Sequence, residues 1–332
     1  MAKVGHNFSP KDYSCWVIQE VTAGTTPTAT SAARALNVDS VSYPSLNVNQ
    51  ALDVRTGGRF LRDDDFYQDN VLRQVELSLS GVLHNDTGHL SLLRNITNDY
   101  TTDIAVARTY TPPPVIYGTA NTTTGDTLTI MIKAGDLSNG TNLVFHGCVV
   151  TNYTISADTG TDSGRYKWSA TLSTGFKPTL NDTTDFGQHY YGNDTDSFLS
   201  SSSAHKVFNT DVVMNNFTLT LDNPAIGIGS TTTGFEQMVR GTEFAVTVDT
   251  QVKLDGNTKG FVNLFDTQTS QATGAGASAG FQIVNNDAYG VLIDNGVITN
   301  VAYSEGDIMM LDCSLKAIND GSDPLVVIDV TA

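Results

Sequence analysis

The chain has 332 residues, and its 18 basic and 35 acidic side chains give a net charge of −17 and an isoelectric point near 4.4. No apolar run approaches the roughly 18 residues of a membrane span, the first residues contain no apolar signal-peptide core, and the three cysteines lie too far apart for a metal or redox motif. Lys and Arg form no cluster of the kind that grips phosphate, which argues against a protein that holds nucleic acid. Thr, Ser, Asn and Gly are plentiful, and these residues favour turns and exposed strand faces, so the composition predicts a mainly β protein.

The first set of periodic elements lies between residues 41 and 178. The segment "SLNVNQAL" leads into the Gly-rich loop "DVRTGGRF", and "VELSLS" then alternates apolar and polar residues like a strand with one buried face. In "HLSLLRNI", Leu90, Leu93 and Ile96 have helical spacing. The segments "NLVFHGCVVTNYTIS" and "RYKWSATLSTGF" flank the turn-rich "ADTGTDSG" and predict a β-hairpin.

Similar elements recur in the same order between residues 212 and 320. "TLTLDNPAI" precedes the loop "GIGSTTTGF", "FAVTVDTQVKL" predicts a strand, and Phe261, Leu264 and Phe265 have helical spacing. "YGVLIDNGVITNVAYS" and "DIMMLDCSLKAI" predict a second hairpin. The motif V-[V/I]-T-N begins at Val149 in one hairpin and at Val297 in the other, 148 positions later. Matches in four successive elements predict a tandem duplication.

The duplication divides the chain into five predicted parts. We expect an N-terminal arm over residues 1–40, a first copy over 41–178 and a polar linker or arm over 179–211. A second copy over 212–320 and a C-terminal tail over 321–332 complete the chain. Each copy is expected to combine antiparallel strands with one short helix.

Motifs that resemble catalytic or metal sites lack the partners that such sites need. "GASAG" matches G-x-S-x-G, but the last histidine, His205, precedes Ser278, so the usual triad order is impossible. D-T-G triplets at Asp86 and Asp158 both fall in the first copy, whereas an aspartic-protease dyad takes one residue from each half. The aspartates of "DTGTDSG" lack the Gly and Glu of a calcium loop. We therefore expect a protein that is not an enzyme and has no cofactor and no metal ion.

The order of elements resembles the tail tube proteins of tailed bacteriophages. The resemblance rests on "SLNVNQALDVRTGGRFLRDDDFYQDN", the alternating strand, the "HLSLLRNI" helix and the final hairpin, and it covers most of residues 41–319. The duplicated form resembles tail tube subunits with two tube modules in one chain. The resemblance implies two β-sandwich modules, each with a flanking α-helix, whose inner strands join those of neighbouring subunits into a barrel around a channel.

The resemblance also implies the function and the partners. Six modules normally make one ring, so two modules in each chain imply a trimer with pseudo-sixfold symmetry. Stacked rings would form the tail tube of the virion, assembled in the cytoplasm of the host bacterium, as a conduit for genome ejection. Its partners would be further copies of the chain, the tape measure protein and tube-capping proteins, and DNA would pass without specific binding.

Two sets of site residues follow from the resemblance. The loop after the first strand of a tube module commonly reaches toward the adjacent ring, and the corresponding segments here are residues 53–69 and 227–240. Opposite charges in the first loop suit pairing between rings, and the candidates are Arg55, Arg59, Arg62, Asp63, Asp64 and Asp65. The polar strand faces are expected to line the lumen, where a wall without positive charge does not bind DNA; these candidates are Glu76, Ser78, Ser80, Thr247, Asp249 and Gln251.

Two other classes of protein are compatible with these patterns. The first is a receptor-binding or adhesin-like β-sandwich protein of a phage or bacterial surface, with "QHYYGNDTDSF" as its ligand loop. Such a protein would be a discrete small oligomer that binds a glycan or a cell surface. The second is a hydrolase with an unrecognised site, whose activity would disappear when one Ser or Asp is changed.

Overall fold

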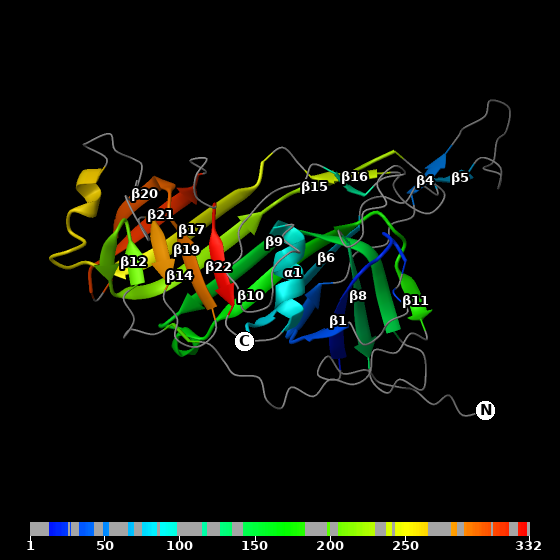
Figure 1. The fold of residues 1–332 in the computed structure, drawn as a ribbon, viewed down its shortest axis with the longest axis horizontal. Helices are drawn as coiled ribbons and strands as arrows, with labels where there is room; N and C mark the ends of the chain where they lie inside the picture. Colours follow the sequence, from blue (N-terminus) through cyan, green and yellow to red (C-terminus); the bar gives the residue numbers. More distant parts are fainter. Residues whose placement is uncertain are drawn as a thin grey trace.

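The computed structural model describes residues 13–25, 27, 33–42, 49–52, 66–69, 75–84, 87–97, 115–117, 127–134, 142–182, 198–199, 205–229, 237–240, 243–264, 280–283, 289–306, 308–318 and 325–330. Strands predominate in this part of the chain, every named pair of strands is antiparallel, and one α-helix is present (Figure 1). The prediction of a mainly β protein is confirmed.

The first half of the described chain, residues 13–182, contains α1 (Thr87–Thr97) and the 3-10 helix η5 (Asp162–Gly164). Its strands are β1 (Tyr13–Gln19), β2 (Arg34–Leu36), β3 (Ser40–Ser42), β4 (Asn49–Leu52), β5 (Phe66–Asp69), β6 (Val75–Val82), β7 (Val115–Tyr117), β8 (Leu128–Ala134), β9 (Asn142–Asp158), β10 (Lys167–Thr174) and β11 (Thr179–Asp182). The predicted hairpin is confirmed as β9 and β10, which are paired along most of the length of β10.

The second half, residues 205–330, contains the 3-10 helix η6 (Phe261–Leu264). Its strands are β12 (His205–Val207), β13 (Thr210–Val212), β14 (Met214–Asp222), β15 (Ala225–Ile228), β16 (Gln237–Arg240), β17 (Ala245–Lys253), β18 (Phe281–Ile283), β19 (Tyr289–Ile293), β20 (Gly296–Ser304), β21 (Met310–Ala317) and β22 (Val327–Val330). The second predicted hairpin is confirmed as β20 and β21.

A long sheet runs through both halves in the order β3-β6-β10-β9-β14-β17-β21-β20. The 17-residue strand β9 belongs to two sheets, because its first part pairs with β8 and β11 and its second part pairs with β10 and β14. The change of sheet occurs beside Gly147, whose φ of +59° suits glycine. The ring of Phe176 lies where a side chain at residue 147 would stand.

The strand order of the first half is matched strand for strand in the second half. The small sheet β2-β1-β8-β9-β11 has the same order of elements as β13-β12-β18-β19-β22. Within the long sheet, β3-β6-β10-β9 has the same order as β14-β17-β21-β20. In Figure 1, the small sheet of the second half, represented by β12, β19 and β22, crosses in front of β14, β17 and β21.

The two hairpins also share a β-bulge at the same place in V-[V/I]-T-N. The ladder between β9 and β10 skips Thr151, and the ladder between β20 and β21 skips Thr299. A bulge adds one residue to a strand, and this extra residue changes the local bend and twist of the sheet. The same extra residue in both hairpins strengthens the likeness of the two halves.

One apolar core lies between the long sheet, the small sheets and α1. The predicted helix of the first half is confirmed as α1, with Leu90, Leu93 and Ile96 all buried in this core. The second half differs, since the described part of its predicted helix is only the single turn η6. The preceding "LDGNTKG" is rich in weak helix formers, and the turn η6 itself buries only Phe261 in the core. Phe265 lies outside the described residues.

Paired strands also lie in the three segments expected to be an arm, a linker and a tail. β1 and β2 lie within residues 1–40, and β1 pairs with β8 along its whole length. β12 and β13 overlap residues 179–211, and β22 lies within residues 321–332 and pairs with β19. Each half of the fold therefore extends beyond the periodic elements that define the predicted copies.

Candidate functional site

The two halves meet edge to edge where β9 pairs with β14. Seven consecutive pairs join the strands, from Asp158 opposite Asn216 to Asn152 opposite Asp222. Inward side chains on both sides of this joint, such as Ile155, are buried in the core. The ring centroids of Tyr166 and Phe217 lie 5.4 Å apart in an edge-to-face contact across the halves. The joint is therefore a continuous piece of sheet with a packed apolar side.

A buried arginine from the second half completes the end of α1 in the first half. The Nη1 group of Arg240 donates to the carbonyls of Val150 at 2.7 Å and Asn223 at 2.8 Å, and Nη2 donates to the carbonyl of Asn95 at 2.7 Å. The side chain of Asn223 donates to the carbonyl of Ile96 at 2.8 Å. Carbonyls in the last helical turn have no partner within the helix and attract a cation, so these contacts tie the halves together.

The six residues predicted to line a lumen lie on one face of the long sheet. Cross-strand register connects Ser80 through β10, β9 and β14 to Thr247, so the candidates from β6 and β17 share this face. Glu76 and Asp249 are exposed, and Ser78, Ser80, Thr247 and Gln251 are partly exposed, whereas the residues between them are buried. We call this surface the polar face.

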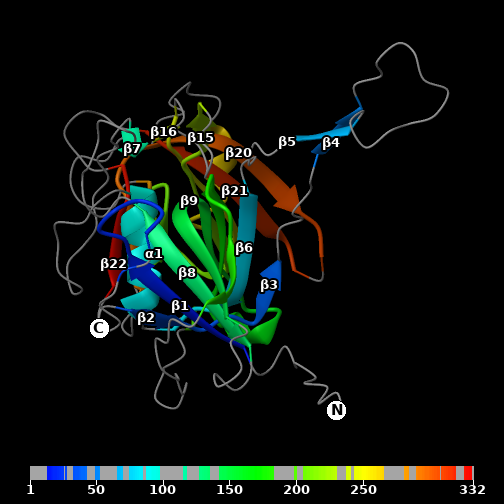
Figure 2. The same cartoon turned by 90° about the vertical axis from the view of Figure 1, so that its right-hand side faces the viewer.

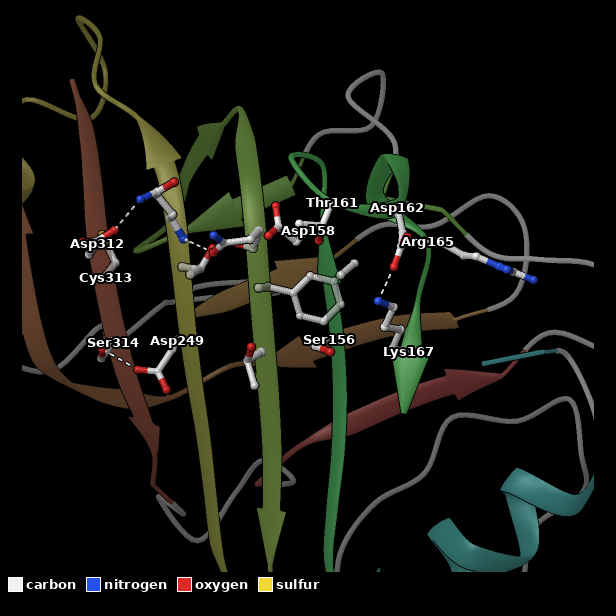
Figure 3. Close-up of a pocket in the computed structure, with 16 residues that line it drawn as sticks. Ser156, Asp158, Thr161, Asp162, Arg165, Lys167, Asp249, Asp312, Cys313 and Ser314 are labelled. Atoms are coloured by element: carbon white, nitrogen blue, oxygen red, sulfur yellow. Dashed lines mark hydrogen bonds and ion pairs between the residues drawn. The ribbon is translucent and has the colours of Figure 1, made fainter. Parts of the chain in front are cut away.

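Hydrogen bonds link side chains across the polar face. The Ser314 hydroxyl donates to Asp249 at 2.6 Å, and the Gln251 amide donates to Asp312 at 2.9 Å. An ion pair joins Lys167 to Asp162, and its hydrogen bond and positive charge hold the pKa of the Asp162 carboxyl below its usual value. In Figure 3, the side chains of Asp162 and Lys167 point toward one another.

A hollow of about 460 Å³ opens on the polar face over β9, β14, β17 and β21 (Figure 3). Four aspartates line it against two cations, Arg165 and Lys167, and the described residues around it include no histidine. Cys313 is a poor candidate for a nucleophile, because desolvation raises the pKa of its thiol to about 12 and keeps it protonated. The hollow offers hydrogen-bonding groups and a negative charge balance.

The aspartates of the "DTGTDSG" turn are engaged in local contacts. Asp158 accepts a hydrogen bond from the backbone N–H of Gly160 at 2.8 Å, which is an Asx turn. Within the described parts of the chain, no group of three or more His, Cys, Asp or Glu side chains is placed to hold a metal ion. Asp86 and Ser278 lie outside the described residues.

Among the described strands, the long sheet ends in two open edges, since β20 pairs only with β21 and β3 pairs only with β6. In β20 and in the turn that follows it, large apolar side chains are exposed: Tyr303 by 53%, Ile308 by 68% and Met309 by 49%. We call these three residues the edge patch. Single exposed apolar residues are common, but several at an open strand edge are typical of an interaction surface.

The edge patch corresponds to buried positions in the first half. Tyr303 has the place of Ile155 in the hairpin register, and Met309 has the place of Tyr166. Ile155 and Tyr166 are each 1% exposed, because β14 and Phe217 of the second half cover them. The edge patch is therefore the part of the second half that lacks the cover found at the β9–β14 joint.

The residues predicted to connect stacked rings lie outside the described residues; they are Arg55, Arg59, Arg62, Asp63, Asp64 and Asp65. The strands on either side of them, β4 and β5, are described and pair with each other. In the corresponding segment of the second half, Arg240 is buried against the first half.

Sequence reasoning missed the edge patch and Arg240. The offset of 148 residues between the two similar hairpins aligns exposed Tyr303 with Ile155, so a comparison of the two hairpins would have indicated this patch. Arg240 had no comparable signal, because its acceptors lie up to 145 residues away along the chain.

No protein-family model matches this chain, and the search of curated proteins found no match. No helix in the described parts of the chain is long and apolar enough to cross a membrane.

Proposed function

We propose that the chain is a structural subunit that joins copies of itself through its open strand edges into closed rings. Stacked rings would form the tail tube of a tailed bacteriophage, with the polar face turned toward a channel for DNA. The observation that carries this proposal is the β9–β14 joint, which connects two halves of equal strand order within one chain. The corresponding edges, β20 and β3, have no further partner among the described strands.

A tandem duplication accounts for the matching strand orders, registers and bulges of the two halves. If the halves are copies of one module, the end of one copy that binds the start of the next should work between chains as well as within one. β20 of one chain would then pair with β3 of its neighbour, as β9 pairs with β14. Continued pairing removes both exposed edges when the ring closes. Two modules in each chain and six in each ring give a ring of three chains.

The polar face supports the assignment to a channel. The rows of Ser, Thr and Asn side chains on this face can hydrogen-bond to water, and its carboxylates outnumber its cations around the hollow. A surface without clustered Lys and Arg does not accumulate DNA by counterion release. DNA could therefore pass such a wall without being held.

The register of the joint predicts which residues meet between neighbouring chains. Within the chain, Ser156 of β9 lies opposite Thr218 of β14. Ser304 of β20 has the place of Ser156 of β9 in the hairpin register. Ser42 has the place of Thr218, because Ser42 pairs with Ser78 of β6 and Thr218 pairs with Asp249, the corresponding residue of β17. Ser304 of one copy should therefore lie opposite Ser42 of the next.

Disulfide trapping tests this pair. The variant Ser42→Cys/Ser304→Cys should form disulfide-linked dimers and trimers under mild oxidation, since directly opposite residues are close enough for a bridge. The three native cysteines are buried and leave a low background. Ser40→Cys/Ser304→Cys is the matched control, as residue 40 lies on the same side of β3 but about 7 Å further along. Equal linkage in both variants, or no linkage in assembled protein, would overturn the proposed joint.

A further inference from the structure

We propose that the β4–β5 hairpin of one copy docks on the second half of the neighbouring copy, over Val297 at the start of β20. This inference rests on the proposed self-association, and it adds a second contact to the strand joint. The occupant is a second copy of this chain, because an equivalent contact of the β15–β16 hairpin already exists within the chain.

The β4–β5 hairpin is the counterpart of the β15–β16 hairpin. β4 and β5 lie between β3 and β6 in the chain, as β15 and β16 lie between β14 and β17. Both hairpins have four paired positions. At the end of each hairpin nearest the long sheet, Asn49 opposite Asp69 corresponds to Ala225 opposite Arg240. Position 67 then corresponds to Met238, since each lies two residues before the end of its strand.

The β15–β16 hairpin is docked on the first half. Ala225 and Met238 are buried and form one apolar cluster with Val149 of β9, which is also fully buried. Arg240 adds its hydrogen bonds to Val150 and to the end of α1. The hairpin also pairs with β7 of the first half. It therefore holds the halves together beside the β9–β14 joint.

Among the described elements, β4 and β5 have numerous backbone contacts only with each other, and the β4–β5 hairpin stands apart from the sheets in Figure 2. At the other end of the molecule, Val297 has the place of Val149 in the hairpin register. Val149 is fully buried, but Val297 is partly exposed. Within the described parts of the chain, the first half therefore carries a hairpin that stands apart from the sheets, and the second half has a partly exposed valine at the position that the β15–β16 hairpin covers in the first half.

Strand pairing between chains would bring these two parts together. If β3 of one copy pairs with β20 of its neighbour, as β14 pairs with β9, the chain that leaves β3 enters the neighbour beside Val297. The contact would be centred on positions 49 and 67, the counterparts of Ala225 and Met238. It would lack the contribution of Arg240, because Asp69 has that position and a carboxylate cannot donate to backbone carbonyls.

The test is a second disulfide experiment on assembled protein. Tyr67→Cys/Val297→Cys should give disulfide-linked chains, about tenfold faster than Gln68→Cys/Val297→Cys, since neighbouring positions of a strand face opposite sides. β4–β5 and β20 lie at opposite ends of one molecule in Figure 1, so linked chains report a contact between copies. Asn49→Cys/Val297→Cys provides an independent pair from the other strand of the hairpin.

The Ser42→Cys/Ser304→Cys variant separates this inference from the proposed ring. Linkage of residue 304 to residue 42 together with linkage of residue 297 to residue 67 or 49 would support both contacts. Linkage of 304 to 42 alone, with the residue 67 and 49 pairs no faster than the control, would overturn the hairpin contact and retain the ring. If assembled protein gave no linkage of 304 to 42 either, the strand joint itself would be wrong.

Discussion

Tyr303→Asp is expected to abolish the assembly of rings and tubes while the isolated chain stays folded. In the free chain Tyr303 is 53% exposed, so an aspartate there can be hydrated. In the proposed ring this side chain has the environment of Ile155, which is 1% exposed at the β9–β14 joint. An unpaired carboxylate buried there would cost several kcal/mol. The cost recurs at every joint of a ring, so the ring should not form.

Sedimentation velocity over a wide range of protein concentrations measures this effect, and circular dichroism checks the fold. Tyr303→Phe is the matched control. It keeps the aromatic side chain and its apolar contact, so this variant should assemble like the unmodified chain. Assembly of Tyr303→Asp at the same concentration as the unmodified chain would show that the edge patch is not an interface. A lower melting temperature of the monomer would instead indicate that Tyr303 stabilises the fold itself.

Arg240→Ala is expected to lower the free energy of unfolding by about 3 kcal/mol or more, since three buried carbonyls each lose a hydrogen bond at a cost of roughly 1–3 kcal/mol per carbonyl. The substitution leaves three buried carbonyls without the donors that Arg240 supplies, and buried acceptors without partners are costly. The end of α1 and the β15–β16 hairpin should both loosen, because Arg240 joins them.

Thermal and urea unfolding measure the loss of stability, and hydrogen exchange locates it. Arg240→Lys should recover part of the loss, since one ammonium group keeps the charge but cannot reach all the acceptors that a planar guanidinium spans. Lys167→Ala is a second control and should change stability little, because its ion pair with Asp162 is half exposed to water. Unfolding of Arg240→Ala at the same temperature and urea concentration as the unmodified chain would contradict the structural role of Arg240.

Local periodicity was sufficient to predict several elements correctly. The spacing of Leu90, Leu93 and Ile96 is that of a helix with one buried face, and α1 has this face in the core. The alternation in β6 and β17 predicted which side chains would be exposed, and all six lumen candidates lie on the polar face. Elements of this kind are determined by neighbours within a few residues, which a sequence pattern displays directly.

Long-range pairing could not be predicted in this way. Cys15 lies opposite Ile132, so the partner of β1 is more than a hundred residues away and no periodicity identifies it. The β9–β14 joint depends equally on contacts between segments far apart in the sequence. The bulges at Thr151 and Thr299 also had no signature of their own, although the shared motif marked their position. These features depend on the packing of whole sheets, and the open edges can be identified only when this packing is known.

Electron microscopy of the purified protein at increasing concentration would show directly whether the chain forms rings. We expect hollow rings of three chains with pseudo-sixfold appearance, which stack into tubes with the polar face on the channel. The Tyr303→Asp variant, prepared in parallel, should show none of these rings. A compact closed oligomer without a channel would overturn the tube proposal and favour a receptor-binding protein, and a ring of six chains would overturn the proposed role of the duplication.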